Sequence, residues 1–108
     1  MPRGITPNPY SLEMIAERLK LLRRTLDLSQ QMMGTMAGVT GNAWHNYEVG
    51  RRRIEIEQAI RLKITTGCPI EWIYTGDERG VPRDLAKRLE TARKLQQVTS
   101  IVQNSLGR

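Results

Sequence analysis

The chain has 108 residues, 39% of them hydrophobic and none of them phenylalanine, which is enough for one small domain with an appended element. It carries 17 lysines and arginines against 11 aspartates and glutamates, and the net charge of +6 favours a polyanionic partner over a charge that serves solubility alone. One cysteine and one histidine exclude a disulfide framework, a metal site built on cysteines or histidines, and a Ser-His-Asp triad.

Membrane and catalytic roles find no support in the sequence. It contains neither an apolar run long enough to span a membrane nor the apolar segment of a signal peptide. Glu48, Glu55, Glu57 and Glu71 are candidates for acid–base chemistry, but each has a simpler role as an ion-pair, capping or surface residue. Neither a phosphate-binding glycine loop nor a nucleophile elbow is present. We therefore expect a cytoplasmic protein that is not an enzyme and takes no metal and no cofactor.

The first part of the chain predicts a flexible arm followed by a helix. Residues 1–9 hold three of the five prolines, which predicts the arm. Residues 10–27 predict an amphipathic helix, because Ser11 is a suitable N-cap and apolar residues recur every three or four positions. These apolar residues are Leu12, Ile15, Leu19, Leu22 and Leu26. The basic residues of this helix are Arg18, Lys20, Arg23 and Arg24. Most of them are expected in solvent, and a place beside a phosphate backbone is the alternative for some.

The stretch from Leu28 to Gly50 predicts two short helices, over 29–37 and 40–48, joined by a tight turn. Ser29 and Thr40 are suitable N-caps because a hydroxyl accepts a hydrogen bond from a backbone N–H that the helix leaves unpaired. Gly38 lies where the chain must turn, and glycine enters the left-handed region at low cost. These proportions are those of a helix-turn-helix motif.

The second of these helices has two different faces. Ala43, Trp44 and Tyr47 fall together and are predicted to face the core. The opposite face carries small and polar residues, namely Gly41, Asn42, His45 and Asn46. Side chains that donate and accept hydrogen bonds suit the edges of base pairs in a DNA major groove. A solvated face that binds nothing is the alternative, and this helix alone does not choose between them.

Three consecutive arginines, Arg51 to Arg53, follow Gly50 at the end of this helix. They are well placed to pair with phosphates, and a solvated loop is the alternative.

The rest of the chain predicts three more helices. Residues 55–66 form the first, with Ile56, Ala59, Ile60 and Ile64 on or near its buried side, and residues 70–74 form the second. After a linker over 78–82, a helix of roughly 83–105 carries an apolar stripe from Leu85 to Leu106. The stripe must be buried, either against its own domain or against a second copy, and we favour the second copy.

The chain resembles a known family in two segments, RLKLLRRTLDLSQQMMGTMAGVTGNAWHNYEVGRR and CPIEWIYTGD. They are similar to the lambda-repressor-like helix-turn-helix family of Cro/repressor or XRE-type DNA-binding domains. The resemblance covers about residues 12–77, two thirds of the chain. The motifs that carry it are Leu28–Gln30, Gly38–Thr40, Tyr47–Gly50 and Pro69–Ile73 before Thr75-Gly76.

This resemblance implies an all-α fold: a five-helix DNA-binding domain over 10–77, with the C-terminal helix over 83–108 as an added dimerisation or partner-docking element. The helix over 40–48 would lie in the major groove. The positions from which the family contacts bases are matched by Gly41, Asn42 and Asn46, and His45 is a further candidate. The chain differs from the family pattern at Gly34, at Trp44, and at Gly41, where a longer side chain is usual.

The resemblance also implies phosphate contacts and a structural ion pair. Gln30 and Thr40 match positions at the phosphate backbone, and the three arginines occupy a loop that often meets phosphate. Arg23 and Glu48 match a partly buried ion pair that ties the first helix to the end of the third.

The sequence thus predicts a sequence-specific double-stranded DNA-binding transcriptional regulator, most simply a repressor that binds an inverted-repeat operator as a homodimer. It would be associated with the nucleoid when bound. The alternative is an antitoxin-like or other protein-interaction module, whose C-terminal helix binds a protein partner and whose DNA binding is autoregulatory.

Overall fold

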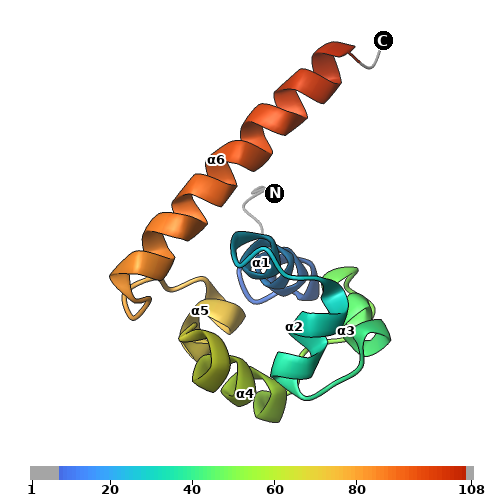
Figure 1. The fold of residues 1–108 in the computed structure, drawn as a ribbon, viewed down its shortest axis with the longest axis vertical. Coiled ribbons are helices and arrows are strands. Elements are labelled where there is room, and N and C mark those ends of the chain that lie inside the picture. Colours follow the sequence, from blue (N-terminus) through green and yellow to red (C-terminus); the bar gives the residue numbers. More distant parts are fainter. Residues whose placement is uncertain (1–7, 107–108) are drawn as a thin grey trace, which may run out of the picture.

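The computed structural model describes residues 8–106 and folds there into six α-helices without a strand (Figure 1). The helices are α1 (Leu12–Thr25), α2 (Gln30–Ala37), α3 (Gly41–Glu48), α4 (Ile56–Thr66), α5 (Ile70–Thr75) and α6 (Arg83–Leu106). The predicted all-α class is confirmed. Most of the predicted arm lies outside the described residues, as do residues 107–108.

Hydroxyl side chains begin the first three helices. The Oγ of Ser11, the Oγ of Ser29 and the Oγ1 of Thr40 accept hydrogen bonds from the N–H of the third helical residue, at 3.1, 3.0 and 3.0 Å. Gly38 ends α2 with a φ of +81°, the left-handed conformation that glycine adopts without a steric penalty. These local signals place α2 and α3 against each other as a helix-turn-helix unit.

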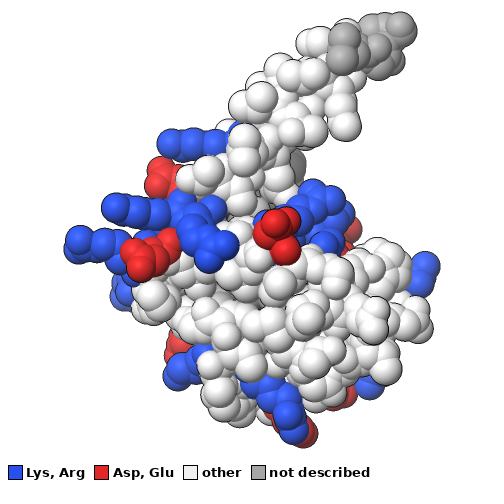
Figure 2. Space-filling view, in the orientation of Figure 1, with Lys and Arg blue, Asp and Glu red and all other residues white. Residues whose placement is uncertain are grey.

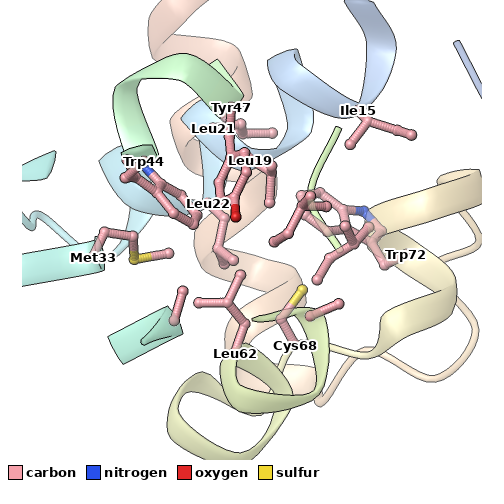
Figure 3. Close-up of a cluster of buried hydrophobic side chains, with 14 of the residues drawn as sticks. Ile15, Leu19, Leu21, Leu22, Met33, Trp44, Tyr47, Leu62, Cys68 and Trp72 are labelled. Carbon is pink, nitrogen blue, oxygen red and sulfur yellow. The ribbon is translucent and has the colours of Figure 1, made fainter. Parts of the chain in front are cut away.

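The core lies where α1 to α5 converge, and both tryptophans are fully buried in it (Figure 3). Trp44 and Tyr47 of α3 meet edge to face, with ring centroids 5.7 Å apart. Cys68 is also buried here, and burial raises the pKa of its thiol to about 12. The other large core side chains include Ile15, Leu19, Leu22, Met33, Ile54, Leu62 and Ile73.

The predicted buried side of α4 is wrong. Ala59 is buried as expected, but its partner in the core is Leu62, while Ile56, Ile60 and Ile64 are exposed. The helix carries apolar residues on two faces, and periodicity favoured the face with more isoleucines. Packing selected the other face, on which Ala59 and Leu62 are fully buried.

Arg18 is also placed differently from the prediction. It is buried rather than solvated, and its guanidinium donates to the backbone carbonyls of Ile73, at 2.9 Å, and Pro9. Burial lowers the pKa of this arginine. The side chain thereby ties α1 to α5 and to the segment that precedes α1.

The C-terminal helix α6 divides into two halves. Leu85 and Leu89 are buried against the domain, and Arg88 donates to the carbonyl of Thr25 at the end of α1, at 3.0 Å. Arg93 still pairs with Glu78 at 3.0 Å, and the half of the helix that follows projects from the domain (Figure 1). The first half therefore folds back on its own domain, while the second half does not.

Steric crowding explains why position 34 is a glycine. A Cβ on Gly34 would lie 2.7 Å from the carbonyl oxygen of Thr40 and 2.8 Å from that of Val39, which is closer than real atoms approach. These are backbone atoms of the turn between α2 and α3. Gly34 therefore lets this turn close tightly against α2.

We expect Gly34→Ala to destabilise the fold, although alanine is the better helix former by about 1 kcal/mol. Displacing the turn should cost about 1–3 kcal/mol more than this gain, measured as the free energy of unfolding in urea. Gly80→Ala is the matched control, because a Cβ there would lie 3.7 Å from Pro69, an ordinary contact. Equal stability of the two variants would refute the steric role of Gly34.

Candidate nucleic-acid interface

One side of α3 anchors the helix in the domain. Trp44 and Tyr47 are buried, and the side chain of Glu48 is only 2% exposed at the C-terminal end of the helix. A buried indole N–H and a buried carboxylate each need hydrogen-bond partners. The two satisfy one another, because Trp44 Nε1 donates to Glu48 Oε2 one turn along the helix.

Glu48 is the centre of a hydrogen-bond network that joins three helices. Arg23 of α1 donates to both carboxylate oxygens, and Gln30 of α2 donates from Nε2 to Oε1 at 3.0 Å. Arg23 also donates to the carbonyl of Leu28, at 3.0 Å. The network therefore fixes the start of α2 and the end of α3 relative to α1.

Burial and hydrogen bonding act in opposite directions on the pKa of Glu48. Burial alone raises it, but the hydrogen bonds from Arg23, Gln30 and Trp44 and the positive charge of Arg23 together outweigh burial. The pKa of this carboxyl is therefore below its usual value, and Glu48 is ionised at neutral pH.

Gln30 links this network to the exposed side of α3. Its Nε2 lies 3.2 Å from Nδ1 of His45 as well as 3.0 Å from Glu48. Because an amide nitrogen only donates, this contact is a hydrogen bond in the tautomer whose Nδ1 accepts. Both amide hydrogens of Gln30 are thus directed at acceptors within the protein, so its backbone N–H at the start of α2 is better placed than its side chain for the predicted phosphate contact.

The exposed side of α3 brings together the four predicted base-contacting residues. Asn42 is exposed, while Gly41, His45 and Asn46 are half-buried. Arg51 Nη1 lies 3.3 Å from the side-chain oxygen of Asn46, and the backbone N–H groups of Arg51 and Arg52 donate to the Asn46 carbonyl. The loop after α3 therefore folds back onto the end of the helix.

All three arginines of this loop are exposed, and each already has a partner. Arg51 contacts Asn46, Arg52 pairs with Glu55 at 3.3 Å, and Arg53 donates to the carbonyl of Tyr10 at 3.0 Å. Exposed pairs of this kind contribute little to stability, so phosphates would displace them at low cost. Thr40 is exposed as well, with its oxygen engaged as the N-cap.

Gln31 is a further exposed residue beside this surface, and it was not predicted from the sequence. A Cβ on Gly41 would lie 3.1 Å from Cα of Gln31, so the two residues are adjacent at the start of α2 and α3. Gln31 is exposed and stands beside the position where the family pattern has a longer side chain. The glycine at the first position of α3 was the available signal, because an absent side chain leaves room for a neighbour.

Residues 8–106 lack two other kinds of site. No group of three or more His, Cys, Asp or Glu side chains there is arranged to hold a metal ion. Over the same range no helix has the length and apolar character needed to cross a membrane.

Comparison with known proteins gives one match of moderate extent. Over 84 residues the chain is 27% identical to a Rhodospirillum rubrum protein named an uncharacterized transcriptional regulator in the ATPase CF(0) region. The aligned stretch covers 77% of this chain and 78% of that protein. No protein-family model and no solved structure matches the chain. The similarity to a transcriptional regulator therefore extends over most of both proteins.

Proposed function

We propose that this chain is a transcriptional regulator that binds double-stranded DNA in a sequence-specific way, most simply a repressor. The observation that carries the proposal is the division of α3 into an anchored side and a polar side. A network centred on Glu48 holds the helix, while the opposite side carries Asn42, which is exposed, and His45 and Asn46, which are half-buried. The regulator from Rhodospirillum rubrum supports the same role.

In this proposal α1 to α5 form a lambda-repressor-like domain, and α3 enters the major groove. Asn42 and Asn46 supply discrimination, because an asparagine pairs with two atoms of adenine and a good contact is worth about 1–3 kcal/mol. In the tautomer that accepts at Nδ1, His45 presents Nε2–H, a donor that suits the acceptors of guanine. Gln31 fills the place beside Gly41.

Phosphate contacts supply affinity that does not depend on sequence. The groups that we propose for these contacts are the backbone N–H groups at the start of α2, the hydroxyl of Thr40 and the arginines Arg51 to Arg53. Thr40 and the three arginines are exposed. Neutralised phosphates release counterions, so this part of the affinity falls steeply with salt.

A single domain with so few base contacts is weakly specific, and we propose that a homodimer binds an inverted repeat. A dimer doubles the contacts and places the half-sites about 34 Å apart, one turn of DNA. The projecting half of α6 is the proposed dimer element. Its exposed apolar residues are Leu95, Val98, Ile101 and Val102.

The same feature favours a second candidate function. An apolar helix that projects from a domain also suits docking on a different protein, as in antitoxin-like modules with autoregulatory DNA binding. A free-standing regulator purified alone should be a well-folded dimer, whereas such a module should have an unstable C-terminal helix.

The deciding experiment is selection of duplexes from a random DNA pool, followed by titration of the selected site at two salt concentrations. We expect an inverted repeat with half-sites one turn apart. Asn46→Ala should then weaken binding to that site about 10-fold or more per half-site, with little change on unrelated DNA.

Arg52→Ala is the contrasting variant. It should weaken binding to every duplex alike and reduce the slope of log K against log salt by about one unit per half-site. If no sequence is enriched, or if Asn46→Ala weakens binding to all duplexes equally, α3 does not select a sequence.

A further inference from the structure

Three isoleucines form an exposed row on α4 that neither the core nor the proposed DNA interface uses. Ile56, Ile60 and Ile64 are 57%, 43% and 77% exposed, and each is one helical turn from the next. The row lies on the helix at the end of the molecule opposite the projecting tip of α6 (Figure 1). Adjacent exposed apolar side chains of this size mark an interaction surface.

We propose that this isoleucine row is a contact surface for a second copy of the chain, with the two α4 helices antiparallel about a two-fold axis at Ile60. Such an axis places Ile60 against the Ile60 of the second copy, and Ile56 against Ile64. A two-fold contact requires a surface that is complementary to itself. The row meets this condition in its apolar residues.

The charges beside the row meet the same condition. Glu57 and Arg61 lie on one flank, one turn apart, and pair within the helix at 3.3 Å. The two-fold axis brings Glu57 of one copy within about 3 Å, along the helix axis, of Arg61 of the other. Lys63 on the opposite flank is separated from its counterpart by about 9 Å along the same axis, which limits their repulsion.

The small apolar area of the row indicates that the contact alone is too weak to hold two free copies together. A stable complex buries about 800 Å² on each partner, and three isoleucine side chains provide only part of this. The contact therefore needs copies that are already held close together. Because the row and the tip of α6 lie at opposite ends, a dimer formed through α6 leaves both rows free to meet neighbouring dimers on DNA. This last step rests on the proposed function.

Cysteine cross-linking tests the contact without DNA. Ile60→Cys at the two-fold axis should give a covalent dimer on mild oxidation at high protein concentration, because the facing Cα atoms come within disulfide range. Ile56→Cys alone should not, since its two copies are about 12 Å apart along the axis, but a mixture with Ile64→Cys should. Cys68 is buried and does not interfere.

Glu71→Cys, exposed on α5, measures cross-linking by random collision. If Ile60→Cys links no faster than this control, or if Ile56→Cys links to itself as readily as to Ile64→Cys, the antiparallel contact is wrong. A row that binds the α6 of another copy, or a different protein, gives this same negative result. Because no DNA is present, failure here is independent of failure to find an operator.

The role on DNA has its own test. On a duplex with two adjacent sites, Ile60→Asp should abolish the cooperative filling of the second site and leave the affinity for a single site unchanged. A loss of single-site affinity with the fold intact would place the row inside one dimer, and retained cooperativity would remove it from the DNA complex. Either result overturns the contact between dimers.

Discussion

Replacing Glu48 by alanine is expected to lower the free energy of unfolding by about 3–5 kcal/mol, a large share of the stability of so small a domain. The substitution leaves Arg23, whose side chain is 17% exposed, without its carboxylate and leaves the buried N–H of Trp44 without an acceptor. Chemical denaturation followed by far-UV circular dichroism measures the loss.

The matched control is Glu55→Ala, which removes an exposed carboxylate paired with Arg52. That side chain is 60% exposed, and an exposed pair contributes at most about 1 kcal/mol. Similar losses for the two variants would show that the network around Glu48 does not hold the three helices together.

The pH dependence of stability is a second test of the role of Glu48. The folded pKa of Glu48 is below its usual value, so its contribution to stability is complete above the unfolded pKa, about 4.3, and is lost as pH falls through the folded pKa. The difference in stability between the natural protein and Glu48→Ala should therefore shrink in acid. A difference that is constant with pH would contradict the role of the ionised carboxylate.

The sequence predicted the helices well where local chemistry decides them. Ser11, Ser29 and Thr40 each cap a helix through a contact within three residues, and Gly38 turns the chain through its own backbone. Such contacts can be predicted without knowing the rest of the fold, because both partners are close in the sequence.

Prediction failed where distant residues decide. Isoleucines on α4 gave the stronger periodic pattern, yet Ala59 and Leu62 fit the space that the other helices leave. Arg18 was expected in solvent because charged side chains usually are, but carbonyls of residues 9 and 73 accept its hydrogen bonds.

At the candidate site, helical geometry was enough to predict which residues share the polar side of α3. It could not predict the hydrogen bonds that orient this helix. The contact of Gln30 with both His45 and Glu48 joins residues 15 and 18 positions apart, and it directs the Gln30 amide at acceptors within the protein. The place of Gln31 beside Gly41 likewise depends on how α2 and α3 pack.

The stripe on α6 was one continuous feature in the sequence and becomes two in the structure. Leu85, Leu89 and Ala92 face the domain, and with about 100° per residue Leu95, Val98 and Val102 lie about a third of a turn away around the helix. The projecting half is also uncharged from residue 95 to residue 106, as its surface shows (Figure 2). Two copies of this uncharged helix can pack through apolar contacts without charge repulsion. A charged partner, in contrast, would meet no residue of opposite charge on it.

Introducing aspartate at both Val98 and Val102 is therefore expected to convert the proposed dimer to a monomer, because like charges would be buried against one another. Binding to an inverted repeat should weaken by about 10²- to 10⁴-fold, the advantage that joining two half-site contacts confers. Binding to a single half-site should not change, since both valines belong to the half of α6 that projects away from the domain containing α3 (Figure 1). Sedimentation and DNA titration measure the two effects.

Ser100→Asp is the matched control, because it adds a charge at an exposed position of the same helix about 160° away from both Val98 and Val102. It should remain dimeric and bind the inverted repeat normally. If the double aspartate variant stays dimeric, the interface lies elsewhere and the projecting helix is free for another protein. If it is monomeric and still binds the inverted repeat with full affinity, one domain alone supplies the specificity, and the reason for pairing through α6 disappears.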